Sequence, residues 1–282
     1  MSIKILIDSA SDITNLEAKE LGIEMIPLII NFSDEEYYDG VDLYPEDFYN
    51  KLKKSKVLPK TSMINPERYR KTFAELLKKD DKVLSISISS KLSGSYASAV
   101  EAAKMFPNQV YPIDSMNCAM GERILCMYAI SLVKKNYEIE TIVEKLNQVK
   151  NNIVLCGGLD TLEYLKKGGR ISSSTAFIGS LLSIKPICQL IDGEVKMISK
   201  VRGQNKVNDA LNKIITDNGP IDYDMPYCIF YTGTDKSRAI LYRDSNPTLF
   251  REEDNVSVHC LGSTIGTHVG PNVLGLAFFK KV

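Results

Sequence analysis

Hydroxyl side chains gather in a short stretch that begins with the pattern of a strand and ends with that of a helix. Residues 85–100 read SISISSKLSGSYASAV, and the turn between the two patterns holds Ser93 and Gly94 among further serines. Backbone N–H groups at the start of a helix, together with serine hydroxyls, bind anions without a formal positive charge. The turn therefore predicts a site for a carboxylate or a phosphate, with simple capping of the helix as the alternative.

A second group of hydroxyls lies in the stretch PKTSMINPERY. Asn65 is the better N-cap of the helix that opens at Pro66, which leaves Thr61 and Ser62 without a capping role. Taken alone, this stretch is typical of an ordinary polar loop.

The third candidate is GSTIGTHVGPNVLG, residues 262–275, where glycines and a proline surround Thr267 and His268. Glycines in an otherwise apolar stretch indicate tight turns or a close approach of the backbone to a ligand. A lone histidine is more often structural than catalytic, but the glycine setting favours a functional residue here.

Ser93 and His268 also permit a second interpretation, a serine esterase with one as nucleophile and the other as base. The turn Leu92–Gly94 lacks the G-x-S-x-G elbow of such enzymes, and no acid is assigned to orient the histidine. The esterase stays open as an alternative, as does a binding module for another acyl or phosphorylated small molecule.

Two arginines follow apolar elements at ends marked by glycine. Arg170 ends the run LEYLKKGGR, beyond a helix that Gly168 and Gly169 would close, and Arg202 precedes Gly203. Such positions are usually exposed, so the arginines belong either to a solvated surface or to a basic patch.

Composition narrows the class of protein. The 282 residues suggest two domains, at roughly 150 residues each, and we expect them at 1–150 and 151–282. A formal net charge of +0 argues against nucleic-acid binding. The six cysteines form no C-x-x-C pair and the two histidines have no metal-ligand neighbours, so we expect reduced thiols, no metal and no cofactor. The N-terminus resembles no signal peptide, which predicts a cytoplasmic location.

The order of apolar patterns predicts an α/β fold. In the first half, short apolar runs alternate with amphipathic ones, which indicates a mostly parallel, doubly wound sheet. The second half reads as an α+β domain, with an apolar helix over 174–184 and a hairpin turning at Asp192-Gly193. With no flexible linker between them, the two domains are expected to hold a ligand in their crevice.

Several segments, in order and at matching spacing, resemble the DegV family over essentially the whole chain. They are ILIDSASDI, TSMINP, SSKLSGSYASA, LEYLKKGGRI with SLLSIKPI, and GTHVGPNVLG. The resemblance implies a two-domain protein that holds a long-chain fatty acid between its domains, as the binding subunit of a bacterial fatty acid kinase. The partner kinase would phosphorylate the carboxyl group, giving an acyl phosphate for phospholipid synthesis.

The same resemblance assigns roles to residues. Thr61, Ser93, Thr267 and His268 match the positions that hold the ligand carboxylate, with Ser62 and Gly94 as secondary contacts. The resemblance further implies that Arg170 and Arg202 bind the kinase. It implies no catalytic residue in this chain, and a transient contact with a membrane surface is a further expected interaction.

A fatty acid needs a small polar clamp and an apolar tunnel behind it. We expect the hydroxyl turn to supply an uncharged clamp, and TAFIGSLLSI and ICQLI to supply tunnel walls. TSMINP and GPNVLG depart from the commoner family patterns TSQPSP and GPGALG, so Met63 and Ile64 are expected to alter which chains fit.

Overall fold

The computed structural model describes residues 2–77, 81–171, 183–251 and 256–281. Its first sheet contains four parallel strands in the order β2-β1-β6-β7, which confirms the predicted parallel sheet. The strands are β1 (Ile3–Asp8), β2 (Glu24–Ile26), β6 (Lys82–Ser87) and β7 (Val110–Asp114). The last four residues of β1 and the last five of β6 are buried, as expected of strands covered on both faces, although Asp8, Ser85 and Ser87 are among them.

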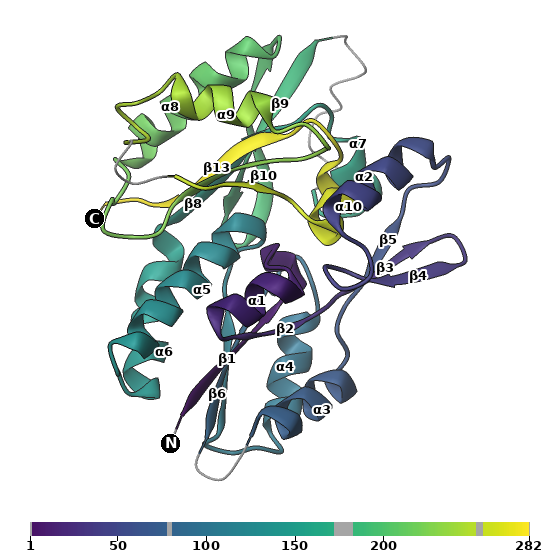
Figure 1. Ribbon diagram of the computed structural model, residues 1–282. Coiled ribbons are helices and arrows are strands. Elements are labelled where there is room, and N and C mark those ends of the chain that lie inside the picture. The colour runs from purple at the N-terminus through teal and green to yellow at the C-terminus, as the bar shows by residue number, and fades with distance from the viewer. Residues whose placement is uncertain (1, 78–80, 172–182, 252–255, 282) are drawn as a thin grey trace.

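Helices cover both faces of this sheet, as a doubly wound fold requires. α3 and α4 pack on one face and α5 and α6 on the other (Figure 1). The helices of this half are α1 (Asn15–Leu21), α3 (Pro66–Leu76), α4 (Ser95–Ala103), α5 (Ala119–Lys134) and α6 (Ile139–Val149). The strand order reverses between β1 and β6, and in open α/β sheets ligands bind beyond the carboxyl ends of the strands at such a point. The turn that holds Ser93 lies there, directly after β6.

The apolar run IEMIPLIINF divides between two sheets. The run 23–32 becomes β2, in the parallel sheet, and β3 (Ile29–Phe32), which pairs antiparallel with β4 (Glu35–Tyr38) and β5 (Lys60–Ser62). Pro27 separates them, because proline has no N–H group to continue a ladder. With α2 (Pro45–Lys54), this three-stranded sheet encloses a small core of its own, made of Ile30, Phe32, Leu43, Phe48, Tyr49 and Leu52.

The second half of the chain builds a six-stranded mixed sheet in the order β10-β9-β8-β13-β11-β12. Its strands are β8 (Ile153–Gly158), β9 (Ile184–Ile191), β10 (Glu194–Arg202), β11 (Cys228–Tyr231), β12 (Val258–Cys260) and β13 (Leu274–Phe279). Its helices are α7 (Glu163–Lys167), α8 (Asn205–Asn218), α9 (Ser237–Asp244) and α10 (Ser263–Val269). The β9-β10 hairpin turns at Asp192 (φ 53°) and Gly193 (φ 79°), the left-handed pair predicted from the sequence.

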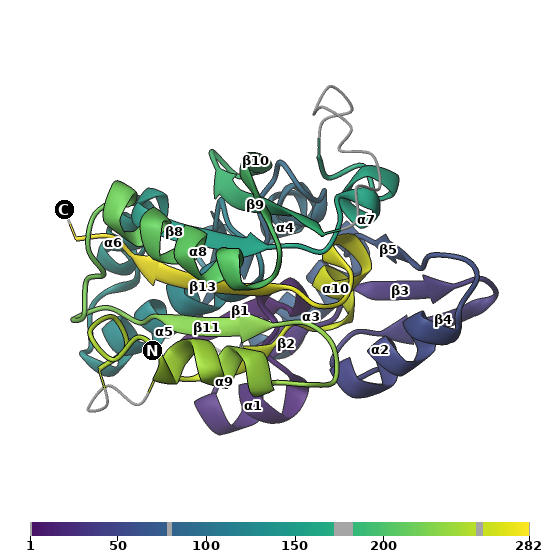
Figure 2. The ribbon, with the colours of Figure 1, turned by 90° about the horizontal axis from the view of Figure 1, so that it is seen from above.

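The two faces of this sheet have different partners. α8 and α9 cover the upper face (Figures 1 and 2), where Val154, Ile229 and Leu276 join their core. The lower face, which carries Leu155 and Phe230, packs toward the first half of the chain. α5 lies between the two sheets, and 11 of its 16 residues are buried, as expected of a helix enclosed on most sides.

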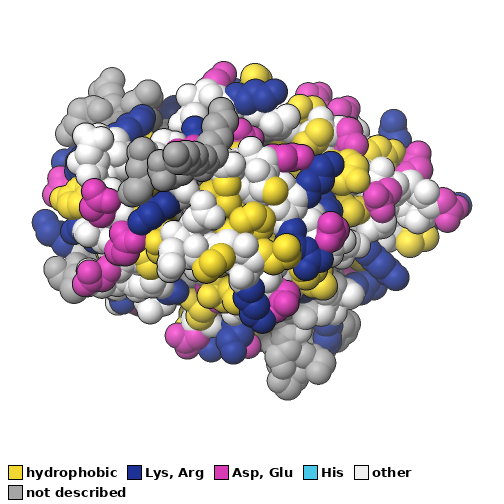
Figure 3. Space-filling view, turned by 90° about the horizontal axis from the view of Figure 1, so that it is seen from below, with side chains coloured by type: hydrophobic (Ala, Val, Ile, Leu, Met, Phe, Trp, Pro, Cys, Tyr) yellow, Lys and Arg dark blue, Asp and Glu magenta, His cyan; other side chains and the backbone are white. Residues whose placement is uncertain are grey.

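The strands of the parallel sheet end at Asp114 and those of the mixed sheet begin at Ile153. A domain boundary at residue 150 is consistent with this order and stays a prediction. The apolar helix predicted over 174–184 lies outside the described residues except for its last two positions. Lys and Arg side chains alternate with Asp and Glu on the face shown in Figure 3, in keeping with the net charge of +0.

Candidate functional site

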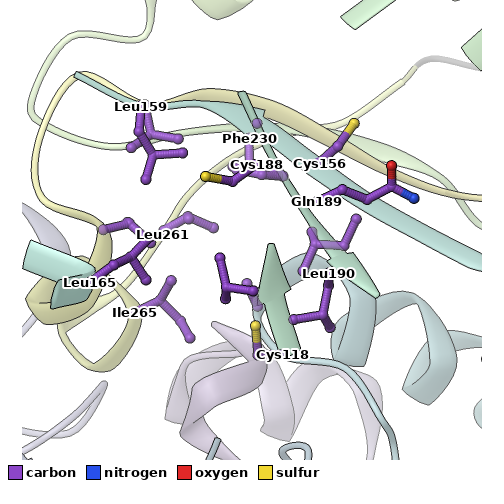
Figure 4. A pocket seen from close by; sticks show the side chains of 16 residues that line it. Cys118, Cys156, Leu159, Leu165, Cys188, Gln189, Leu190, Phe230, Leu261 and Ile265 are labelled. Carbon is purple, nitrogen blue, oxygen red and sulfur yellow. The ribbon is translucent and has the colours of Figure 1, made fainter. Parts of the chain in front are cut away.

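An apolar cavity lies under the mixed sheet (Figure 4), with about 480 Å³ of empty space that includes its opening to solvent. The walls come from β8, β9, β10, β11, α7, α10 and the start of α5. Gln189 is the polar residue among the described lining residues, and its side-chain amide donates to Asn218 Oδ1 at 3.3 Å, away from the space. The predicted wall segment ICQLI contributes Cys188, Gln189 and Leu190, whereas the other predicted wall segment, TAFIGSLLSI, falls mostly on residues outside the description.

A second cavity, of about 520 Å³, adjoins the first and ends in polar side chains. The two cavities share Cys118, Leu165, Val195, Ile265 and Val269 as walls. At its polar end the second cavity brings together four residues from distant parts of the chain, namely Thr61, Ser93, Arg170 and His268. The arrangement is one elongated, largely apolar space with polar groups at one end.

Thr61 and His268 contact each other directly. Thr61 Oγ1 on β5 lies 2.9 Å from His268 Nε2 in the last turn of α10, within hydrogen-bonding distance. Burial, followed by the nearby charge of Arg170, lowers the pKa of His268 to about 4. His268 is therefore neutral at neutral pH, so the ring contributes polarity and shape rather than charge.

The other side of the histidine ring lies against the backbone. A Cβ atom added at Gly168 would sit 2.3 Å from His268 Nδ1, so only glycine leaves room for the ring in this position. His268 Nδ1 is buried and has no hydrogen-bond partner among the described residues. Gly168 of the KKGGR segment therefore does more than end α7.

Ser93 stands at the cavity wall with its hydroxyl turned to its own helix. Ser93 Oγ lies 3.0 Å from Ser95 Oγ and accepts a hydrogen bond from Ser95 N at 3.2 Å. Ser95 Oγ in turn accepts from Ile64 N at 3.3 Å, which fastens the second hydroxyl loop to the first. Ser93 thus accepts from the first amide of α4 and also lines the cavity, and the anion site predicted at this turn stays a prediction.

This geometry gives no support to a serine esterase. His268 Nε2 is placed against Thr61 rather than Ser93, and the described residues provide no acid bonded to Nδ1. A triad needs the base to contact the nucleophile and an acid to orient the base.

The remaining sequence candidates lie outside the cavity. Thr267 Oγ1 donates to Ser263 O within α10 at 2.8 Å, and Thr267 faces a groove outside the polar end of the cavity. Ser62 Oγ accepts from Asn31 Nδ2 at 3.2 Å on the exposed side of β5. Gly94 packs under Met63, whose Sδ lies 2.4 Å from where a Cβ would be. Ligand contacts by Thr267, Ser62 and Gly94 stay predictions.

The sequence predicted an uncharged clamp, but the charged side chain of Arg170 forms part of the cavity wall. Arg170 Nε donates to Leu92 O at 3.1 Å and Nη1 to Gly168 O at 2.6 Å, which ties the side chain across the site. The residue is half-buried, and burial lowers the pKa of its guanidinium. Arg202 lies exposed at the end of β10 and lines neither cavity. Sequence reasoning placed both arginines at a partner surface, and that role stays a prediction.

Two buried carboxylates, which the sequence analysis did not single out, hold α10 in place. Asp39 accepts hydrogen bonds from Ser263 N at 3.0 Å and Thr264 N at 3.3 Å, and Asp12 accepts from Gly262 N at 2.7 Å. Burial raises the pKa of both carboxyl groups. Since Ile265, His268 and Val269 line the cavity, these contacts from the first half of the chain position one wall of the site.

Glu122 and Asp8 are two further buried carboxyl groups near this anchor. Burial, followed by the charges of Asp8 and Asp12, raises the pKa of Glu122 well above its ordinary range. Burial also raises the pKa of Asp8 to about 7, although Ile88 N and Ala10 N donate to it. Within the described part of the chain, no group of three His, Cys, Asp or Glu side chains is arranged to hold a metal ion. Nor does any described helix have the length and apolar character needed to cross a membrane.

Comparison with known proteins places the chain in a family. The family model described as "Uncharacterised protein, DegV family" matches residues 2–281. A DegV domain-containing protein of Caldanaerobacter subterraneus is 34% identical over 289 residues, which cover 99% of each chain. The chain belongs to the DegV family.

Solved structures of this family share the fold over their full length. A DegV family protein from Thermus thermophilus, described as binding fatty acid, matches with a TM-score of 0.88 and 29% identity, covering 100% of both chains. DegV from Bacillus subtilis, described as a fatty acid binding protein, matches with a TM-score of 0.85 and 29% identity, again over 100% of both chains.

Proposed function

We propose that this protein binds a long-chain fatty acid between its two halves and presents the carboxylate to a partner kinase. The observation that carries the proposal is the elongated apolar cavity that ends at Thr61, Ser93, Arg170 and His268. Such a space matches a single chain with one polar end. The fatty-acid binding described for the family members from Thermus thermophilus and Bacillus subtilis supports it.

The apolar walls and the polar end of the cavity make different contributions to the free energy of binding. Burying about 14 methylenes at about 0.8 kcal/mol each contributes roughly 11 kcal/mol before the costs of ordering the ligand. The apolar walls therefore supply most of the affinity. The polar end prevents an unpaired buried carboxylate, and Arg170 adds a positive charge beside it.

The polar end also faces outward. Thr61, Arg170 and His268 line both the cavity and the groove outside it, so a carboxylate held there would be within reach of a second protein. Phosphorylation by a partner would give an acyl phosphate for phospholipid synthesis, with no catalytic residue, metal or cofactor required of this chain. Arg202, exposed at the end of β10, is the proposed partner contact that lies away from the ligand.

Mass spectrometry of organic extracts from the purified protein tests the first part. We expect one long-chain fatty acid per protein molecule. Protein that is repeatedly free of lipid, and takes up no fatty acid when offered it, would contradict the proposal. For the second part, Arg202→Ala should keep the bound lipid and lower kinase-coupled acyl phosphate production. Equal losses of lipid and activity would place Arg202 in the ligand site instead.

A further inference from the structure

A separate groove lies at one edge of the mixed sheet, where β8, β10 and β11 end and where β9 and β13 begin. This space, the sheet-edge groove, has a volume of about 700 Å³ that includes its opening to solvent. One wall comes from the start of α9, which runs beside β11 (Figure 2). The groove shares Val273 with the apolar cavity and none of the described residues with the second cavity, which holds the polar end. It is therefore distinct from the proposed fatty-acid site.

Arg238, in the first turn of α9, is a half-buried cation in the wall of this groove. Within the described part of the chain its guanidinium forms no ion pair, and its partners are neutral oxygens. Nη1 donates to Asn272 O at 3.3 Å, and the side-chain amide oxygen of Gln204, turned toward the guanidinium, accepts from Nε at 3.2 Å and from Nη2 at 3.0 Å. Burial, partly offset by the charge of Asp160, lowers the pKa of this guanidinium.

The other charges of the sheet-edge groove are paired or exposed. Lys185 Nζ lies 2.6 Å from Asp160 Oδ1, and Asn272 Nδ2 donates to Asp160 Oδ2 at 2.9 Å, so both oxygens of this carboxylate are engaged. Asp235 is exposed and accepts from Ser237 N at 2.8 Å. One positive charge, that of Arg238, is thus left without a counter-charge in the wall. The two carboxylates nearby disfavour a ligand with more than one negative charge.

Apolar groups lie in the same lining as the guanidinium. Ala239, Val273, Leu274 and the ring of Tyr231 complete the groove. The planar guanidinium of arginine receives a carboxylate through two parallel hydrogen bonds. Acidic side chains of proteins have few apolar atoms to place against such a wall. The lining therefore suits a small molecule whose carboxylate is attached to an aromatic or short apolar body.

We propose that the sheet-edge groove is a second ligand site, which binds a small monocarboxylate with an aromatic or short apolar body. The carboxylate pairs with Arg238, in the place that the amide oxygen of Gln204 takes in this structure. Because this groove and the polar end of the cavity are lined by different residues, the proposal does not depend on fatty-acid binding.

The test uses three probes that share a phenyl ring. Benzoate, benzamide and phenyl phosphate carry one negative charge, none and about two, respectively. Ligand-observed NMR titrations of the purified protein compare their affinities. Arg238→Gln removes the cation, Gln204→Ala removes the competing amide, and Gln204→Glu supplies an internal carboxylate to the same guanidinium nitrogens. Gln148→Glu, at an exposed glutamine of α6, is the matched control.

We expect benzoate to bind the unmodified protein more tightly than benzamide or phenyl phosphate. Arg238→Gln and Gln204→Glu should each weaken benzoate binding at least about tenfold, the size of one charge-assisted hydrogen bond. Gln204→Ala should bind benzoate at least as tightly as the unmodified protein, and Gln148→Glu should bind it normally. Gln204→Glu should also unfold at a higher temperature, because the half-buried cation gains a partner.

Several results would overturn the proposal. Equal benzoate affinity in Gln204→Glu and the unmodified protein would place benzoate elsewhere, for example in the fatty-acid cavity. A lower unfolding temperature of Gln204→Glu would show that no carboxylate fits beside Arg238. Unmodified protein that binds no benzoate would exclude the site. Acetate that binds as tightly as benzoate would overturn the assigned ligand class, because the apolar lining would then contribute nothing.

Discussion

The substitution Gly168→Ala should displace the His268 side chain at the polar end of the cavity. Gly168 has φ −76° and ψ −10°, which alanine adopts without strain, so the added methyl group acts only through its contacts. Its carbon would lie 2.3 Å from His268 Nδ1, where ordinary contacts begin at 3.4 Å. The imidazole ring must therefore retreat by about 1 Å.

Thr61 Oγ1 already lies 2.9 Å from His268 Nε2, so a ring displaced by that much cannot keep the geometry of this hydrogen bond. Losing one or two neutral hydrogen bonds costs about 1–2 kcal/mol, or about five- to thirtyfold in the dissociation constant. Binding should weaken by that factor and still be measurable, because chain burial contributes roughly 11 kcal/mol.

Competition against a fluorescent fatty acid on delipidated protein measures the effect. Gly169→Ala is the matched control, since its Cβ would meet nothing within 4 Å but its φ of +71° is unfavourable for alanine. We expect Gly169→Ala to cost roughly 1 kcal/mol of stability and to leave affinity unchanged. In a His268→Ala background, Gly168→Ala should have no further effect. Normal affinity in Gly168→Ala alone, or the same loss in Gly169→Ala, would refute this explanation.

Three further outcomes are expected. Ser93→Ala should slow acyl phosphate formation more than it reduces bound lipid, because one hydroxyl contributes on the order of 1 kcal/mol; complete loss of lipid in extracts would show the reverse. Cys188→Phe, in the cavity beyond the polar end, should shift the bound fatty acids toward shorter chains in mass spectra, and an unchanged profile would contradict the cavity assignment. As pH rises above the ordinary pKa range of a glutamate, the free energy of unfolding should fall, because burial raises the pKa of Glu122 and the folded protein keeps a proton that the unfolded chain has released. Urea titrations should show a smaller fall in Glu122→Gln, whose amide resembles the protonated acid, and an identical slope would exclude this cause.

Local patterns in the sequence predicted most of the elements correctly. The Asp192-Gly193 hairpin and the cap of α3 by Asn65, whose side chain accepts from Arg68 N, depend on neighbouring residues and occur as predicted. The parallel sheet followed from the alternation of apolar and amphipathic runs. The separation of two sheets at Pro27 depends on pairing with strands farther along the chain, which no local pattern predicts.

Site residues could be predicted from the sequence only where they lie in short recognisable motifs. Ser93 and His268 were singled out from hydroxyls and glycines near element ends, Thr61 was added by the family resemblance, and the structure brings all three to one cavity. The position of Arg170 in the cavity wall depends on its contact with Leu92, 78 residues away, which no local pattern encodes. The bond between Asp39 and Ser263 spans 224 residues and was missed for the same reason.

The anchoring of α10 by buried carboxylates bears on how a ligand enters and leaves. Many two-part binding proteins exchange ligands by hinge rotation of their halves. Here such a rotation would pull the amides at the start of α10 away from Asp12 and Asp39, at roughly 1–3 kcal/mol for each group left unpaired. Withdrawal lengthwise, past Thr61 and Arg170, breaks neither contact. The off-rate should therefore fall steadily with every methylene in the chain, whereas a hinge would release all chain lengths at one common rate.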